Sequence, residues 1–306
     1  MSEIERLNKQ FGFSNNKSTV LFEKGEGDIP IIKIKNELAT ARISLQGAHV
    51  LSWIPKNEKE VVWLSEDAVF SKGKSLRGGI PICWPWFGAH ENNTHFPAHG
   101  FARTVFWNVL STQLLESGAT QIKFELRVEH CNENIRKMCP DTIVAEYTLI
   151  IGAALTLELV THNNGTEAFV LSEALHTYFN VENVKEVSVT GLDKIFYLDK
   201  PDAFKRKLQQ GDIKINTEVD RVYLQTTDDV IVKNKNRKIM ISKTGSCSTV
   251  VWNPWKQVAE KMGDLGEDGY LEMLCVESAN AADDVVTILP GESHNMTVTY
   301  NIESDK

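Results

Sequence analysis

The chain has 306 residues, of which 42% are hydrophobic and 24% charged, a mixture typical of a globular protein with a large core. Its formal net charge of −8 argues against non-specific binding to nucleic acid or to an anionic membrane, because both need a basic surface. Since no apolar run approaches ~20 residues, we expect no membrane-spanning segment.

The predicted helices are short and few. Helical patterns occupy residues 4–10, 132–137 and 257–262. Between them lie turn-forming clusters, of which Gly152–Ala154 predicts a hairpin and Asn164-Gly165 predicts another, since Asn-Gly is a strong hairpin signal.

Strand signals dominate the rest of the chain. Apolar residues alternate with polar ones over residues 122–128, 147–151, 155–159 and 296–300. Many strands with regular turns and few helices indicate an all-β fold, a large antiparallel β-sandwich or barrel. We see no repeat or linker, so we expect residues 1–306 to form a single domain.

An aromatic segment at residues 77–103 is the most informative stretch. Glycines and prolines interrupt it, so it is neither a plain helix nor a long strand. It holds five aromatic residues and three histidines. Over the slightly longer stretch of residues 71–103 the net charge is +3, from Lys72, Lys74, Arg77 and Arg103 against Glu91. An irregular basic backbone lined with rings suits a sugar-like or anionic ligand. In this interpretation Lys72 and Lys74 add only background charge.

His176 is a candidate proton donor or acceptor. We place it on the strand that returns after Asn164-Gly165, where alternation puts it on one face with Ser172, Ala174 and Tyr178. Small residues on that face leave room for a ligand. A structural role in the core is the alternative.

Glu277 is a candidate base. It lies at the end of a predicted strand within residues 270–279. Alternation puts Leu271, Met273 and Cys275 on the face of Glu277, and Leu274 and Val276 on the other. A strand that is apolar on both faces is buried, so Glu277 should be partly desolvated, which raises a carboxyl pKa. A surface carboxylate or ion pair is the alternative. A histidine and a semi-buried glutamate together suit acid–base catalysis near neutral pH.

Other reactive groups point to weaker hypotheses. His90, His95 and His99 are candidate metal ligands, but their spacing matches no tight ligand pattern. Five cysteines without a CxxC pair, after a polar N-terminus, indicate reduced thiols in a cytoplasmic protein. Cys83 has no evident base nearby in sequence, and Cys275 fits an ordinary buried thiol.

Six motifs in one order resemble the D-hexose-6-phosphate mutarotases, or glucose-6-phosphate 1-epimerases, of the aldose 1-epimerase superfamily. They span most of the chain, namely Gln46–Trp53, Arg77–Pro81, His99–Arg103, Leu175–Phe179, Val251–Trp255 and Cys275–Glu277. The resemblance implies a galactose mutarotase-like β-sandwich with a sugar site on one concave face. It implies catalytic roles for His176 and Glu277.

The resemblance also implies the remaining site residues. It assigns substrate binding to Arg77, His99, Arg103 and Asp220, with the aspartate on the loosest motif. It implies a small sugar phosphate as partner, no metal and no organic cofactor. We further expect a monomer. Trp252 and Trp255 stack on the sugar or simply pack.

Three alternatives stay open at this point. The same chemistry serves an aldose 1-epimerase for free sugars. The same scaffold serves a non-catalytic sugar-phosphate-binding protein, because fold does not fix function. A metal-dependent enzyme would use His90, His95 and His99.

Overall fold

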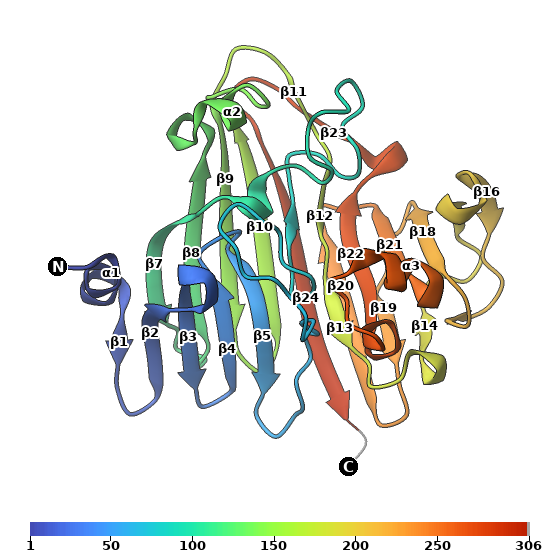
Figure 1. Cartoon of the computed structure of the whole chain (residues 1–306), viewed down its shortest axis with the longest axis horizontal. Coiled ribbons are helices and arrows are strands. Elements are labelled where there is room, and N and C mark those ends of the chain that lie inside the picture. The colour runs from blue at the N-terminus through green and yellow to red at the C-terminus, as the bar shows by residue number, and fades with distance from the viewer. Residues whose placement is uncertain (305–306) are drawn as a thin grey trace.

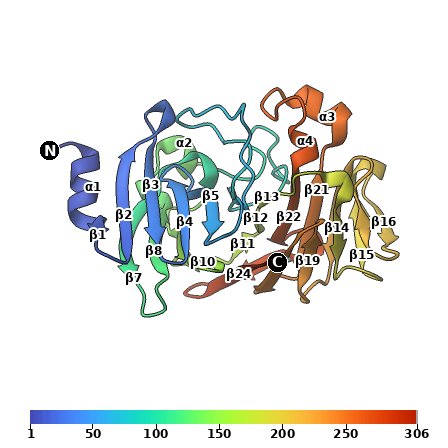
Figure 2. The same cartoon turned by 90° about the horizontal axis from the view of Figure 1, so that it is seen from below.

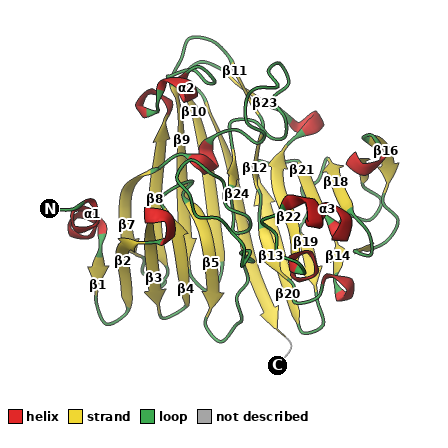
Figure 3. Cartoon of the chain, viewed as in Figure 1, coloured by secondary structure: helices red, strands yellow, loops and turns green. Residues whose placement is uncertain are grey.

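The computed structural model describes residues 1–304. Strands dominate it, and the helices are short and peripheral (Figure 3). The three predicted helices are confirmed as α1 (Glu3–Phe11), α2 (Glu133–Arg136) and α3 (Trp255–Met262). A further short helix, α4 (Gly269–Glu272), occupies part of the segment predicted as a strand over 270–279. No helix within residues 1–304 combines the length and the apolar character needed to cross a membrane.

A nine-stranded antiparallel sheet forms the back of the molecule (Figure 1). All four strands predicted from alternation belong to this sheet. One face of each strand is buried, which explains why apolar and polar residues alternate along it. In spatial order the sheet comprises β17 (Ile213–Lys214), β14 (Ser188–Thr190), β19 (Val230–Lys233), β20 (Arg237–Thr244), β24 (Ser293–Ser304), β10 (Leu155–Asn163), β9 (Ile143–Ile151), β8 (Thr120–Arg127) and β7 (Asn108–Leu114).

Two further sheets cover different halves of this one (Figure 2). The N-terminal half of the chain supplies a five-stranded sheet, which comprises β1 (Phe13–Ser14), β2 (Ser18–Lys24), β3 (Pro30–Asn36), β4 (Ala39–Ser44) and β5 (His49–Pro55). The other is an eight-stranded sheet, which comprises β16 (Lys205–Leu208), β15 (Phe196–Asp199), β18 (Val219–Leu224), β21 (Ser248–Asn253), β22 (Met273–Asn280), β12 (Glu173–Leu175), β6 (Ile82–Cys83) and β13 (Tyr178–Asn180).

The Asn164-Gly165 hairpin prediction is wrong. Both edges of β10 are already paired, one with β9 and the other with β24, so the returning chain has no edge to join. Instead β11 (Phe169–Leu171) pairs with β23 (Val286–Ile288), and the chain then enters the eight-stranded sheet at β12. The Gly152–Ala154 turn does join β9 to β10 as predicted.

One hydrophobic cluster runs from Leu7 to Tyr300 and takes side chains from all three large sheets. On β22, Leu274 and Val276 point into this cluster, whereas Cys275 and Ala279 belong to smaller clusters on the opposite face. The alternation predicted from the sequence is therefore confirmed for this strand. Because one core joins the sheets, we propose that the chain folds as a single domain.

Gly100 fixes the end of the aromatic segment, and we predict that Gly100→Ala is strongly destabilising. Its φ is +69°, and an added Cβ would lie 1.9 Å from the carbonyl oxygen of Trp84, which accepts the N–H groups of Phe101 and Ala102. Gly88→Ala is the matched control, because its φ is +76° and an added Cβ meets nothing within 4 Å.

Both substitutions carry the strain of a positive φ, about 1 kcal/mol. The clash should cost Gly100→Ala about 1–3 kcal/mol more. Denaturant unfolding checks this, and equal losses of unfolding free energy in the two variants would contradict it.

Candidate active site

His176 and Glu277 face each other across neighbouring strands. β12 and β13 pair with β22 in the same register, Leu175 with Ser278 and Tyr178 with Cys275, and that register places His176 opposite Glu277. The ring Nε2 lies 3.3 Å from the carboxylate Oε1. Both side chains are buried, with 9% of His176 and 1% of Glu277 exposed. The sequence places them a hundred residues apart, and the sheet makes them a contacting pair.

The strand expected to carry His176 is interrupted at this residue. The N–H of Thr177 donates to the carbonyl of Leu175 in a tight turn, and the N–H of His176 donates to Pro81 instead of β22. The predicted face is confirmed in part, because the rings of His176 and Tyr178 stack with centroids 4.9 Å apart. Ser172 lies outside the strands, between β11 and β12, and its Oγ accepts the N–H of Phe87.

Glu277 also differs from its prediction in position. We expected a carboxylate emerging at the end of a strand, whereas Glu277 lies inside β22 with Val250 of β21 on its other side. The strand starts at Met273, after α4, so the carboxylate falls in its middle. Ala174 pairs with Ala279 in the neighbouring row of the sheet. Both side chains are fully buried in a small apolar cluster instead of facing the cavity, so they do not provide the space that the sequence predicted.

A cavity of about 270 Å³ opens over this face of the eight-stranded sheet. All six residues predicted from the sequence line it, and so do several others. The lining comprises Arg77, His99, Arg103, His176, Asp220 and Glu277, with Ser75, Leu76, Phe87, Tyr178, Lys200, Trp252 and Met262. The structure thus gathers the predicted site residues into one place.

Two arginines reach the cavity from the aromatic segment. The Nε of Arg77 donates to Asp264 at 3.0 Å, and its Nη1 donates to the hydroxyl of Tyr178 at 3.1 Å. Arg103 follows Gly100 on a short 3-10 turn, and its Nη2 donates to the carbonyl of Ala98 at 2.9 Å. Arg77 is therefore ion-paired, while Arg103 has no ion pair within residues 1–304.

Lys200 is a third cation in the cavity, and sequence reasoning missed it. Its Nζ lies 3.1 Å from Asp220 and 5.5 Å from the centre of the Phe87 ring. Asp199 and Asp202 flank it in the sequence, so the sequence pattern indicates an ordinary solvated turn.

Asp220 lies on β18 next to Trp252, whose ring meets His176 edge-on. Trp255 packs against Tyr270 instead.

Burial dominates the electrostatics of the pair. It raises the pKa of Glu277 well above its usual range, with Lys200 and Arg103 opposing the rise. It lowers the pKa of His176 well below its usual range, and His99 and Arg103 add to the fall. Burial lowers the pKa of His99 to about 3. His176 and Glu277 are thus expected to hold one proton between them across a range that includes neutral pH.

Two polar atoms of the pair lack a partner. Within residues 1–304, the buried Nδ1 of His176 and Oε2 of Glu277 make no hydrogen bond. Buried polar groups normally find a partner, so unpaired ones in a cavity are typical of a ligand site. The arrangement suits donation and acceptance of protons on one small polar molecule.

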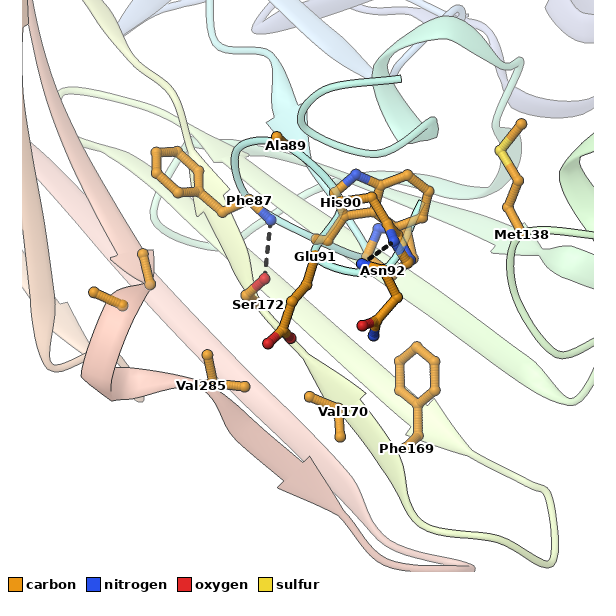
Figure 4. A pocket seen from close by; sticks show the side chains of 14 residues that line it. Phe87, Ala89, His90, Glu91, Asn92, Met138, Phe169, Val170, Ser172 and Val285 are labelled. Carbon is orange, nitrogen blue, oxygen red and sulfur yellow. Dashed lines mark hydrogen bonds between the residues drawn. The ribbon is translucent and has the colours of Figure 1, made fainter. Parts of the chain in front are cut away.

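A larger cavity, of about 530 Å³, lies beside Phe87 (Figure 4). Its lining includes His90, Glu91 and Asn92 together with Phe169 and Val170. Within the described chain, none of the six predicted site residues lines it. It therefore lacks the contacting pair of His176 and Glu277, and we assign the chemistry to the cavity of about 270 Å³.

The three histidines of the aromatic segment do not gather as metal ligands. The ring of His90 packs on Trp86 and Phe96, with centroid distances of 4.8 and 4.9 Å, and His99 borders the His176 cavity. Within residues 1–304, the group of side chains close enough to share an ion is His176, Cys275 and Glu277. The hypothesis of a site built from His90, His95 and His99 is not supported by this geometry.

Comparison with known proteins places the chain in a family. The family described as "Aldose 1-epimerase" matches residues 30–301. The chain belongs to the aldose 1-epimerase family. It is therefore an isomerase by family, and the resemblance stated from its motifs is confirmed at this level.

Relatives of known name cover most of the chain. A protein of Escherichia coli named "Putative glucose-6-phosphate 1-epimerase" is 35% identical over 270 residues, which cover 87% of this chain and 88% of that protein. One of Cenchrus ciliaris with the same name is 37% identical over 261 residues, with 82% and 78% covered.

The fold also matches a solved structure. A crystal structure titled as a "putative mutarotase" from Salmonella typhimurium superposes with a TM-score of 0.86 at 29% identity, covering 99% of this chain and all of that one. The predicted mutarotase-like β-sandwich is thereby confirmed.

Proposed function

We propose that the protein interconverts the α and β anomers of a hexose 6-phosphate, with glucose 6-phosphate as the first substrate to test. The contact between His176 and Glu277 carries the proposal, because it puts a proton donor and a proton acceptor side by side in one cavity. O1 and O5 of a pyranose are bonded to the same carbon, so their catalysts must lie close together. The names of the relatives support the choice of substrate.

In the proposed reaction Glu277 removes the proton from the anomeric hydroxyl O1. The O1–C1 bond becomes a carbonyl as the C1–O5 bond breaks, and His176, as imidazolium, gives a proton to O5. Rotation about C1–C2 presents the other face of the aldehyde, and closure runs with the roles reversed. Each positioned acid or base typically contributes ~10²–10⁴-fold.

The proton has to start on His176 in this scheme. Burial by itself favours the proton on Glu277, because the neutral pair avoids two desolvated charges. The 3.3 Å contact between Nε2 and Oε1 gives the proton a direct path. Sugar hydroxyls that donate to the carboxylate would stabilise its ionised form and so favour the transfer.

We assign the phosphate to the basic side of the cavity. Arg77, Arg103 and Lys200 all line it, and guanidinium groups bind phosphate oxygens in a bidentate manner. The pairing of Arg77 with Asp264 and of Lys200 with Asp220 favours the rival proposal, a free aldose as substrate, because part of the positive charge is already neutralised.

Anomer exchange followed by NMR separates these proposals. We expect the protein to accelerate exchange of glucose 6-phosphate more than that of glucose. A preference for glucose would favour the free-aldose enzyme. Saturable sugar binding with exchange at the solvent rate would show a non-catalytic binding protein. Size-exclusion chromatography tests the separate proposal of a monomer.

The pair should make the rate depend on pH in a bell-shaped manner. The doubly protonated pair loses its first proton at a macroscopic pKa no higher than that of His176, which burial places below the ordinary value of 6.5. We therefore expect kcat/KM to hold steady as pH falls through 6.5 and to decline only at lower pH. An acid limb centred above 6.5 in the pH–rate profile would contradict this assignment.

A further inference from the structure

Cys275 is a buried thiol beside the catalytic pair that the proposed proton transfers do not use. It precedes Glu277 by two residues on β22, so it lies on the same face of the sheet, and it sits opposite Tyr178. One ligand atom from each of His176, Cys275 and Glu277 lies within 4.8 Å of the others. The three offer a ring nitrogen, a sulfur and a carboxylate oxygen.

These distances approach those of a tetrahedral zinc site. Bond lengths of about 2.0–2.3 Å to Zn²⁺ place neighbouring ligand atoms roughly 3.3–3.6 Å apart. The Nε2 of His176 and the Oε1 of Glu277 are already 3.3 Å apart. The longest separation in the group, at most 4.8 Å, has to shorten by roughly 1 Å, which small side-chain rotations provide.

The surroundings leave room for such an ion. The cavity supplies an open fourth position for water, and Oε2 of Glu277 has no hydrogen-bond partner within residues 1–304. Two of the three nearby cations are paired, Arg77 with Asp264 and Lys200 with Asp220, which limits their repulsion of a divalent ion. A thiolate ligand selects soft ions such as Zn²⁺ or Cd²⁺ over Mg²⁺ and Ca²⁺.

We propose that His176, Cys275 and Glu277 form an inhibitory site for a thiophilic divalent cation. The ion takes the nitrogen and oxygen atoms that the proton transfers need. Its binding releases two protons to solvent, one from the thiol and the one that His176 and Glu277 share, so bound metal and catalysis exclude each other. The inhibition rests on the proposed function, whereas the binding of the ion does not.

Two measurements on the whole protein test the site separately. The first titrates Cd²⁺ without sugar and follows the ultraviolet thiolate-to-cadmium absorption. The second follows anomer exchange of glucose 6-phosphate with added Zn²⁺, and with Mg²⁺ as the hard-cation control. We expect one equivalent of Cd²⁺ to bind, and Zn²⁺ but not Mg²⁺ to inhibit exchange.

Cysteine variants locate the thiolate. Cys275→Ser should lose the absorption band and become at least tenfold less sensitive to Zn²⁺, while its basal exchange rate stays close to that of the wild type. Cys83→Ser, which removes another fully buried thiol, and Cys247→Ser, which removes an exposed one, should both keep the band. Cys275→Ala serves if the serine variant does not fold.

A band that survives in the Cys275 variants, or that disappears in a control variant, would overturn the site. A wild-type protein that binds no Cd²⁺ would overturn it as well. If the wild-type protein leaves anomer exchange at the solvent rate, the proposed function fails, and the Cd²⁺ titration alone still decides for or against the metal site.

Discussion

Replacing His176 with alanine is expected to slow anomer exchange of glucose 6-phosphate by roughly 10²–10⁴-fold, the contribution typical of one positioned acid or base. The imidazole is the group that supplies a proton to O5, and its Nε2 contacts Glu277 at 3.3 Å. Within the described residues the nearest other imidazole is that of His99, with its centroid 5.8 Å away, and burial and nearby cations keep its pKa at about 3. A neutral His99 does not replace the acid.

The pair should act as one unit. Because ring opening needs both proton transfers, the double variant His176→Ala, Glu277→Gln should be about as slow as either single variant. Anomer-exchange rates of the three variants, measured by NMR, check this, with thermal unfolding as a control for the fold. A His176→Ala protein with near wild-type exchange, or losses that multiply in the double variant, would argue against a coupled acid–base pair.

Replacing Arg103 with alanine is expected to separate phosphorylated from free sugars. Among the three cations of the cavity, Arg103 has no carboxylate partner in the described chain, so its charge is the most available to a phosphate. A hydrogen bond to a charged group is worth about 1.5–3 kcal/mol, which corresponds to a loss of about 10–150-fold in kcat/KM for glucose 6-phosphate. The loss for glucose should be much smaller.

Two further variants serve as references for Arg103→Ala. Lys72→Ala removes a positive charge from the same basic segment, but Lys72 is exposed and does not line the cavity, so both sugars should react as with the wild type. Arg77→Ala should discriminate less than Arg103→Ala, because Asp264 already neutralises Arg77. Equal losses for glucose and glucose 6-phosphate in Arg103→Ala would remove Arg103 from the phosphate site.

Much of the fold follows from local pattern. Alternation predicts β8, β9, β10 and the end of β24, and it correctly puts Leu274 and Val276 on the face of β22 opposite to Cys275. Strand partners are less accessible, because they depend on which edges remain free. The Asn164-Gly165 turn fails as a hairpin for that reason, since β9 and β24 already occupy β10.

The site, too, follows partly from local sequence pattern and partly from the way the strands assemble. The family resemblance identifies six of the lining residues, five of them within distinctive motifs and Asp220 in a looser one. The register that sets His176 opposite Glu277 arises only when β12, β13 and β22 assemble. Lys200 and Asp264 enter through loops whose charges look solvated in the sequence, and their roles depend on contacts with Asp220 and Arg77.

A crystal structure of the Glu277→Gln variant with glucose 6-phosphate tests the central claim most directly. We predict that the sugar lies in the cavity of about 270 Å³, with O1 beside residue 277, O5 beside His176 and the phosphate against Arg103. A sugar bound in the larger cavity beside Phe87, or one whose C1 lies out of reach of His176, would contradict the account.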